Sequence, residues 1–599
     1  MIHSDEPTGT ENNSTNKPVT RQRLFSFGVI TDTHIRAPQG DLSSPFPVNE
    51  LANDRAAHAV QLLANQNTSF NIHLGDMVHP LPHMAAYNSA CEAAMEIFKP
   101  LQPALYFVPG NHDIGDKPMP GLPAAAINDH ALTCYSQQFG DSYYVIDDHN
   151  NEHHNCLFIV LNSSLINSGV SQAKEQTDWL ESTLKKYQNK RIFLFLHYPL
   201  FINSETEAEH YDNLAEPGRT WLFYLIRKHN IELVLSGHVH HFFYNRINNT
   251  HLYTLPPTSF TRQDYAELFK IDPTNEFGRD DIGKYSVAVI DVYDTGYELR
   301  IIPTHGKSNE DSANTPNCIT PPGRKKLTVH MRHAWYESID LPYNGPMEEF
   351  CRKRARNDYL FMRLKQMGIC DVRIPLHDII DPVSYNRALD YIATGFRFHG
   401  FCPQPQLKNI LSNNRDSLHS LATLECVTMG KIDSLTEPKL TGAYPPLIIG
   451  HAQTGAHTTD QNKPFAHSVS SGFNWSDHKK VLALVEQWEI PIHGLVFQIH
   501  WEDDLQSMLD QMQTTFSSLP YRCIANVRLS SANPALANFD DNAITKRVKT
   551  LTKFNQISTN SIDLQLDTAM DIDRGYSPRH GLIDRLGNLR PAGNWLSKN

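Results

Sequence analysis

The chain has 599 residues, of which 40% are apolar and 20% are charged, and its formal net charge is −12. This length exceeds one ordinary domain and predicts two to four domains with ample apolar cores. The acidic balance, with no long basic run, excludes a broad positive face for a nucleic-acid polymer. No stretch approaches the ~18 consecutive apolar residues of a membrane helix, so we expect a cytoplasmic protein without a membrane partner.

The first 23 residues are rich in Ser, Thr, Asn and Glu and contain no apolar stretch. They have the features of neither a secretory signal nor an anchor, and we expect a disordered leader over 1–23. The nine cysteines show no C-x-x-C spacing. That distribution predicts neither a disulfide framework nor a zinc ribbon.

Five short apolar runs in the first 240 residues are typical of buried strands, and a polar motif follows each one. The runs are 24–31, 69–74, 104–108, 191–196 and 232–235. The motifs, in the same order, are Asp32-Thr33-His34, Gly75-Asp76, Gly110-Asn111-His112-Asp113, His197 and Gly237-His238-Val239-His240. Because strand ends are rigid, we expect them to gather side chains from distant parts of the chain around one point.

Helical patterns lie between these strands. Apolar residues recur at helical spacing in 56–63 and 84–98, and further helices are predicted over 173–187 and 218–229. The alternation of strands and helices predicts a layered α/β fold. A closing hairpin is predicted over 285–302, and the polar segment 304–325, rich in Ser, Asn, Pro and Gly, is predicted to be a domain linker.

The second part of the chain, 326–599, contains eight further strand patterns with helical patterns between several of them. The strands are predicted over 327–331, 370–374, 395–398, 421–428, 447–450, 494–499, 522–529 and 562–566. The helices are predicted over 347–367, 383–394, 478–487 and 541–555. Eight strands with intervening helices predict a (β/α)8 barrel.

Polar residues after the barrel strands would face the mouth where such barrels bind ligands. We expect a site, with substrate recognition as its favoured role, among His333, Arg373, His377, Asp378, His399, Glu425, His451, His500, Glu502, Arg528, Asp567, Asp571 and Arg574. Glu425 and Glu502 would suit a retaining glycosidase if their carboxyl groups lay about 5–5.5 Å apart. The competing interpretation is that these charges form ion pairs lining a non-catalytic barrel.

The five motifs of the first part supply carboxylates, imidazoles and one amide. These nitrogen and oxygen donors suit Mn, Fe, Zn or Co, and no cysteine takes part. Seven ligands serve two divalent metal ions if one carboxylate is shared, and Asp76 is the expected bridge. Two ions roughly 3.5–4 Å apart can hold a hydroxide nucleophile at neutral pH and clamp a phosphoryl group.

The complete series of motifs resembles the calcineurin-like metallophosphoesterase family, and its variant is similar to the bacterial cyclic-nucleotide and glycerophosphodiester phosphodiesterases. The resemblance implies a four-layer αββα sandwich over 24–303. It implies that Asp32, His34, Asp76 and His240 hold one metal and that Asp76, Asn111, His197 and His238 hold the other. His112 would then face the leaving group as a catalytic residue, and Asp113 would orient His112 by a hydrogen bond.

The sequence thus predicts a dinuclear metal-dependent phosphodiesterase that hydrolyses a small organic phosphodiester by attack of metal-bound hydroxide. Near the motifs only Arg36 and Lys117 supply positive charge, which mildly favours diesters over dianionic monoesters. The alternatives are a phosphomonoesterase acting on a sugar or polyol phosphate, or a carbohydrate-active or carbohydrate-binding barrel with a supporting phosphoesterase half. The expected partner is a small phosphorylated substrate, and a homo-oligomer stays open.

Overall fold

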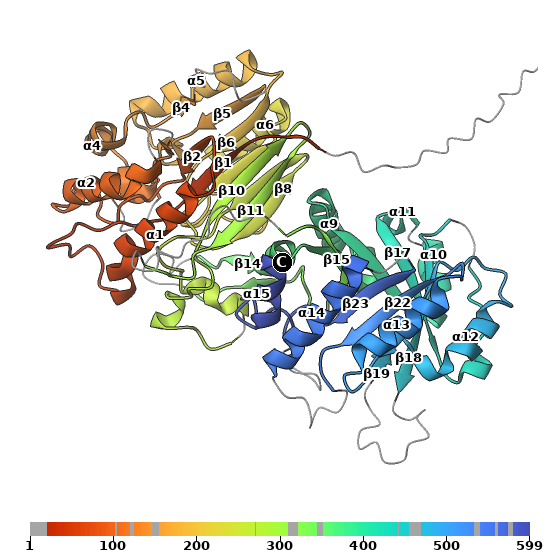
Figure 1. Ribbon diagram of the computed structural model, residues 1–599. Coiled ribbons are helices and arrows are strands. Elements are labelled where there is room, and N and C mark those ends of the chain that lie inside the picture. The colour runs from red at the N-terminus through yellow and green to blue at the C-terminus, as the bar shows by residue number, and fades with distance from the viewer. Residues whose placement is uncertain are drawn as a thin grey trace, which may run out of the picture.

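The computed structural model describes residues 21–101, 105–119, 125–146, 155–269, 271–308, 322–343, 351–413, 415–440, 443–454, 469–531, 540–557, 561–572 and 579–599. Figure 1 shows two parts, one built on two sheets and one built on a barrel. We call them the two-sheet part, from β1 to β11, and the barrel part, from β12 onward. The predicted leader lies almost entirely outside the described residues, as does 309–321 of the predicted linker.

The two-sheet part contains a five-stranded and a six-stranded sheet. The first has the order β11 (Tyr297–Pro303), β10 (Ser286–Tyr293), β1 (Arg23–Ile30), β2 (Phe70–His73) and β3 (Leu105–Phe107). The second has the order β4 (Tyr144–Val145), β5 (Cys156–Val160), β6 (Arg191–Phe195), β7 (Leu233–Ser236), β9 (Thr250–Thr254) and β8 (Phe243–Ile247). The strands β1, β2 and β3 run parallel, as do β5, β6 and β7, so within each set the strand ends meet at one edge.

Helices cover the outer faces of both sheets, which confirms the predicted αββα sandwich. The first sheet packs against α1 (Ala52–Ala64), α2 (Tyr87–Phe98) and α4 (Asp129–Phe139). The second packs against α5 (Ser171–Lys186) and α6 (Gly218–His229). Between the sheets the Phe27 ring lies 5.6 Å from Phe158 and 5.8 Å from Phe195, so alternate strand residues fill the inner core.

The barrel part contains eight parallel strands that close on themselves, as the sequence predicts. Their order is β12 (Lys325–His330), β15 (Ile369–Pro375), β16 (Arg397–Pro403), β17 (Leu421–Met429), β18 (Leu447–Thr454), β21 (Gly494–Ile499), β22 (Arg522–Arg528) and β23 (Ile562–Asp567). Pairing of β18 with β21 and of β12 with β23 closes the ring. Two short strands, β19 (Val469–Ser471) and β20 (Phe473–Asn474), add to β18 and β21.

Helices follow most of the barrel strands. They are α7 (Tyr359–Gln366), α8 (His377–Ile380), α9 (Pro382–Ala393), α10 (Gln404–Asn413), α11 (Arg415–Leu418), α12 (His478–Val485), α13 (Leu505–Phe516), α14 (Asp541–Ile557) and α15 (Pro591–Lys598). Among the described residues between β17 and β18, only a 3-10 turn over Ile432–Ser434 replaces the helix. None of the helices that the structure describes is long and apolar enough to cross a bilayer.

The predicted helix over 347–367 is wrong over the described residues 351–356. The described residues there form β14 (Arg354–Arg356), which pairs antiparallel with β13 (Ser338–Asp340), and the helix α7 begins only at Tyr359. Charged residues around β14 bind the two-sheet part: Arg356 Nη1 lies 3.1 Å from Asn203 Oδ1, and Asp358 accepts a 3.0 Å hydrogen bond from the Tyr244 amide. These tertiary contacts override the helical spacing of the apolar residues.

Several of the expected mouth residues lie within the barrel strands. Arg373, His399, Glu425 and His451 belong to β15, β16, β17 and β18. Arg373 makes a bidentate ion pair with Glu425, at 2.6 and 2.9 Å, and both are buried. This pair favours the interpretation that the barrel charges form ion pairs over the interpretation that Glu425 is the acid of a glycosidase. Arg574 lies outside the described residues.

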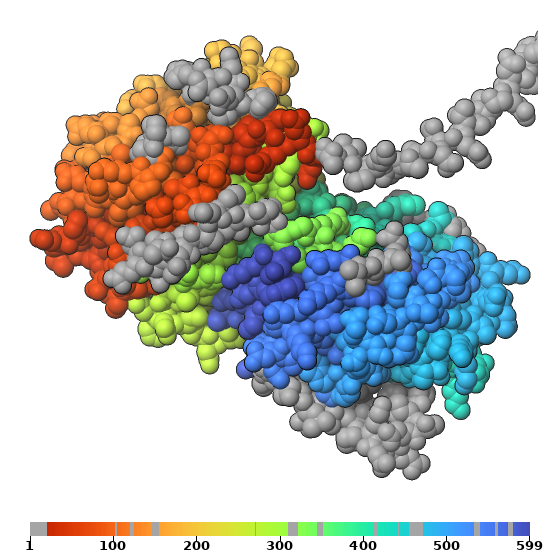
Figure 2. All heavy atoms as spheres, in the orientation of Figure 1, coloured from red at the N-terminus to blue at the C-terminus, as the bar shows by residue number. Residues whose placement is uncertain are grey.

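The two parts meet along a polar and aromatic junction. Besides β14, the segment before α15 reaches back: Asn588 Nδ2 donates to Asp281 Oδ1 at 3.1 Å, and Lys284 Nζ donates to Asn588 Oδ1 at 2.8 Å. Figure 2 shows the dark blue carboxyl-terminal segment against the green surface of the two-sheet part. The barrel part therefore contacts the two-sheet part at two separate places, around β14 and in the segment before α15.

Candidate metal centre

The predicted motifs lie directly after the strands, and their loops run beside one another. The Asp32 amide donates to the Gly75 carbonyl oxygen at 3.1 Å, and the His34 amide donates to the Asp76 carbonyl oxygen at 3.0 Å. The loop after β7 joins them, because the His238 amide donates to Asp32 Oδ1 at 3.1 Å. Hydrogen bonds donated by main-chain amides thus fix three of the five motifs against each other.

Two of the motif glycines stand where the loops approach most closely. A Cβ on Gly75, whose φ is +102°, would lie 2.5 Å from His197 Nδ1 and 2.7 Å from the Gly110 nitrogen. A Cβ on Gly110 would lie 2.1 Å from the Asp76 nitrogen. Glycine is therefore required sterically before Asp76 and before Asn111, since any side chain there would push the loops apart.

The backbone is strained at the residues that carry the chemistry. Positive φ angles of 47° to 70° occur at five of the seven predicted metal ligands, namely Asp32, His34, Asp76, His238 and His240. Non-glycine residues rarely adopt this conformation, and such strain concentrates at functional sites. The surrounding structure must hold these side chains in place against their own backbone preference.

The predicted ligands form two overlapping groups that share Asp76. Donor atoms of Asp32, His34, Asp76 and His240 all lie within 4.8 Å of one another, as do those of Asp76, His197 and His238, and all are buried. His34 Nε2 lies 3.0 Å from His240 Nε2, and Asp76 Oδ2 lies 3.5 Å from His34 Nε2 and 3.3 Å from His197 Nε2. Imidazoles and carboxylates packed this closely away from water fit divalent cations.

Asn111 lies with the second group. Its Oδ1 is 3.1 Å from His197 Nε2 and 2.9 Å from His238 Nδ1, while its Nδ2 donates to Tyr211 Oη at 3.2 Å. The tyrosine thereby occupies the amide nitrogen and leaves the oxygen facing the two histidines. The structure brings all seven predicted ligands together.

Outer hydrogen bonds set which nitrogen each histidine presents. His197 Nδ1 lies 2.8 Å from the Leu74 carbonyl oxygen, and His240 Nδ1 lies 2.7 Å from that of Phe260. A carbonyl oxygen only accepts, so both rings carry a proton on Nδ1 and present Nε2 to the cluster. Partners of this kind commonly orient metal-binding histidines.

The electrostatics of the cluster follow from its burial and its mixed charges. Burial alone would raise the pKa of Asp76, but His197 and its neighbours bring this pKa well below its usual value. Burial would lower the pKa of His197, yet the Asp76 charge raises it to about 9. Burial lowers the pKa of His34 well below its usual value despite Asp76. The shared carboxylate is therefore kept ionised.

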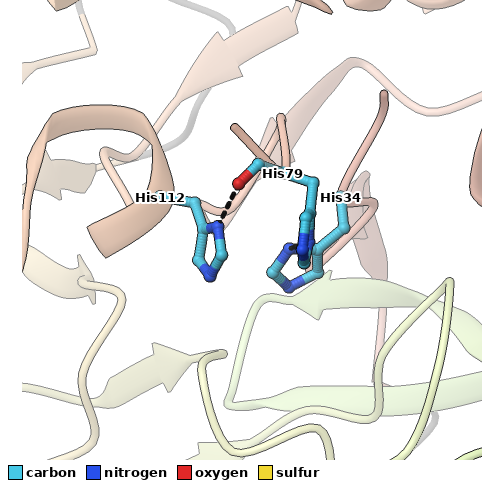
Figure 3. Close-up of side chains that lie close together, drawn as sticks. All are labelled: His34, His79 and His112. Atoms are coloured by element: carbon cyan, nitrogen blue, oxygen red, sulfur yellow. Dashed lines mark hydrogen bonds between the residues drawn. The ribbon is translucent and has the colours of Figure 1, made fainter. Parts of the chain in front are cut away.

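His112 lies beside the cluster together with His79, a histidine to which the sequence gave no role. Figure 3 shows the rings of His34, His79 and His112 side by side, with His112 Nδ1 bonded to the His79 carbonyl oxygen. His79 Nδ1 lies 3.2 Å from His34 Nδ1. The only signal for His79 in the sequence is its place three residues after Asp76.

The contacts of Asp113 differ from the expected hydrogen bond to the His112 ring. Its Oδ2 accepts from the Gly110 amide at 2.9 Å and its Oδ1 from the Val78 amide at 3.2 Å, so it does not orient the His112 ring. Asp113 is the third residue of the short helix α3 (Asn111–Ile114), and a carboxylate there reaches back to the start of the helix. Asp113 instead ties the loop after β3 to the loop after β2.

Positive charge near the site comes from Lys117, which the sequence singled out, and from Arg262 and Arg279, which it did not. Lys117 is buried and donates to the His210 carbonyl oxygen at 2.7 Å. Arg262 forms an ion pair with Asp212, and the Arg279 guanidinium packs 3.8 Å from the Phe46 ring centre and 4.3 Å from that of Phe260. Phe260 in turn lies 4.4 Å from the His240 ring, so Arg279 and its two aromatic partners adjoin the cluster.

Comparisons with known proteins agree with this geometry. Residues 25–242 match the family model described as calcineurin-like phosphoesterase. The zebrafish (Danio rerio) serine/threonine-protein phosphatase CPPED1 is 27% identical over 179 residues, which cover 28% of this chain and 53% of that protein. The 3',5'-cyclic-nucleotide phosphodiesterase alr5338 of Nostoc is 30% identical over 175 residues, which cover 29% and 58%.

The chain spans little more than half the length of these relatives. Among solved structures, GAP50, the anchor in the inner membrane complex of Plasmodium, aligns with 47% of this chain and 86% of its own at 13% identity. Its TM-score of 0.31 is too low to bear on the fold. The family model covers all five motifs and confirms the resemblance that they carry: residues 25–242 are similar to calcineurin-like phosphoesterases.

Proposed function

We propose that the protein is a dinuclear metal-dependent phosphodiesterase acting on a small organic phosphodiester. The observation that carries the proposal is the pair of buried ligand groups sharing Asp76. In it, Asp32, His34, Asp76 and His240 would hold one divalent ion, and Asp76, Asn111, His197 and His238 the other. When bound, such ions supply a nucleophile from water at neutral pH and offset the phosphate charge.

The chain's own residues would position the ester and its leaving group. The His112 amide donates to Asp76 Oδ1 at 2.9 Å, and its Nδ1 donates to the His79 carbonyl oxygen. Both contacts aim the other ring nitrogen, Nε2, into the space beside the cluster. From there Nε2 would donate a proton to the departing oxygen, as a general acid does.

A diester is favoured over a monoester by the surroundings of the cluster. Arg262 is already paired with Asp212, which leaves less free positive charge for a dianion. The Arg279 guanidinium, which packs on the Phe46 and Phe260 rings, would suit an organic substituent. The Nostoc relative is named for a diesterase activity. The vertebrate relatives are named as phosphatases, and they support a phosphomonoesterase as the second candidate.

The test is hydrolysis by the Mn²⁺-loaded full chain of bis(p-nitrophenyl) phosphate, p-nitrophenyl phosphate and a panel of nitrophenyl glycosides. The diester should be the best substrate. Preference for the monoester would establish the second candidate. Turnover of glycosides without either phosphate ester would move the activity to the barrel.

Replacement of the shared carboxylate tests the metal assignment. Asp76→Asn should lose bound metal, measured by elemental analysis, and reduce kcat by more than about 100-fold, since even outer partners of metal ligands cost 10–100-fold. The exposed Asp129→Asn on α4 serves as the matched control and should behave as wild type. Full metal content and turnover in Asp76→Asn would refute the assignment.

A further inference from the structure

The barrel part places one charged side chain inside the two-sheet part, next to the proposed metal centre. Lys353, directly before β14, is 3% exposed, and its Nζ lies 2.6 Å from Asp212 Oδ2. The same ammonium contacts Asp264, whose carboxylate is also fully buried. A buried ammonium so placed needs these carboxylates, because burial of an unpaired charge is strongly unfavourable.

Asp212 is the link from Lys353 toward the metal ligands. Besides Lys353, its carboxylate binds Arg262 and accepts a hydrogen bond from Tyr265 Oη at 2.8 Å. Its Oδ1 lies 3.7 Å from Nε2 of His238. Lys353 and Arg262 both pair with this carboxylate, and the two cations favour its charged form. A fixed negative charge therefore faces one nitrogen of a predicted ligand.

His238 has no other partner for that nitrogen. Among the described residues its Nε2 is buried and makes no hydrogen bond, while its Nδ1 lies 2.9 Å from Asn111 Oδ1 in the second ligand group. A carboxylate facing Nε2 favours the ring form with its proton on Nε2. Nδ1 then has no proton, and its lone pair faces the cluster.

We infer that Lys353 of the barrel part is a positioning residue of the metal centre, acting through Asp212 on His238. The inference rests on the proposed dinuclear site and deepens it. Lys353 and Arg262 hold the Asp212 carboxylate from opposite parts of the molecule, and Asp212 sets the ring form of His238. The barrel part thereby completes the second ligand group of a site whose ligands all belong to the two-sheet part.

The chain offers two matched pairs of variants for the test. Asp212→Asn and Asp264→Asn both replace a buried carboxylate that binds Lys353, but only Asp212 faces His238. Lys353→Met and Arg363→Met both remove a buried cation by which the barrel part binds the two-sheet part. Arg363 Nη2 donates to the Gly283 carbonyl oxygen at 2.7 Å, away from the cluster.

The readouts are Co²⁺ titration of the metal-free full chain followed by visible absorption, and thermal unfolding of each variant. Asp212→Asn and Lys353→Met should weaken one of the two Co²⁺ binding steps by about 10–100-fold, as loss of an outer partner of a ligand does. Asp264→Asn and Arg363→Met should keep both steps as in wild type, whatever their melting temperature.

Equal weakening in Lys353→Met and Arg363→Met would overturn the inference, because loosening of the junction would then explain it. Two normal binding steps in Asp212→Asn would also overturn it. If Lys353→Met does not fold, the isosteric aspartate pair decides. If wild type binds two Co²⁺ ions but hydrolyses no phosphate ester, only the proposed function is refuted. The Co²⁺ binding steps of the variants would still test the role of Lys353.

Discussion

His112 is fixed by two hydrogen bonds. Its amide donates to Asp76 Oδ1, and its ring Nδ1 donates to the His79 carbonyl oxygen. Neither contact uses Nε2. The ring is half-buried, unlike the seven predicted ligands, which are all buried. This difference in exposure separates the side chain that would meet substrate from the side chains that would hold ions.

The first residue-scale prediction concerns this separation. His112→Asn should keep both metal ions and lower kcat by about 10²–10⁴-fold, the usual contribution of a positioned general acid. Metal content and the kinetics of bis(p-nitrophenyl) phosphate hydrolysis would show it. The exposed His130→Ala on α4 is the control. Loss of bound ions from His112→Asn would contradict its assignment outside the ligand sets.

At the residue scale the sequence predicts which side chains converge but not their hydrogen bonds. The seven ligands follow strands whose ends must meet, so their proximity was predictable. Asp113 was misassigned because a motif does not show that its carboxylate turns back to the Gly110 amide. Arg279 comes from a loop far along the chain, and only the folded structure places it on Phe260.

At the element scale, the barrel strands β15 and β16 carry a pH-sensitive cluster. The Asp371 carboxylate accepts from Arg397 Nε at 2.7 Å and lies 3.0 Å from His399 Nε2. Burial would raise its pKa, but His399 and Arg397 lower it from 3.8 to about 2. A carboxylate with a lowered pKa stabilises the fold above its unfolded-state value, and this stabilisation is lost as the pH falls through about 2.

Asp371→Asn should therefore reduce the free energy of unfolding by roughly 1–2 kcal/mol near pH 6, after allowance for solvent around its partners. The difference from wild type should shrink as the pH falls from about 4 toward 2. Urea unfolding of both proteins at pH 6 and pH 3 measures it. An equal difference at both pH values would rule out the carboxylate charge as its source.

The elements themselves were largely predictable. The eight strand patterns of the second part correspond to the eight parallel strands of the barrel. The helix α6 also begins and ends as predicted. The segment around β14 was not predictable, since Arg354 and Arg356 lie on a strand that binds another part of the molecule.

At the scale of the whole molecule, the two parts share one apolar core. A single cluster of buried side chains includes Tyr244 and Phe269 of the two-sheet part and Tyr359, Phe361 and Tyr391 of the barrel part. Buried charges also cross the junction, as Lys353 does. Neither part can unfold without exposing apolar and charged groups of the other.

We therefore expect one cooperative thermal transition for the full chain, although a chain of this length would ordinarily unfold domain by domain. Scanning calorimetry should show one endotherm. Arg356→Met, which removes a buried guanidinium from Asn203 and Asn245, should shift that endotherm as a whole. Two well-separated endotherms in wild type would show that the parts unfold independently.

Because the chain returns to the two-sheet part at Asn588, the structure limits how a substrate would reach the proposed metal centre. The barrel is anchored near β14 and again before α15, so swinging it away would break contacts at two separate points. Hinged opening is thus a poor route of entry. Molecules would instead approach from the side on which His112 is exposed to solvent.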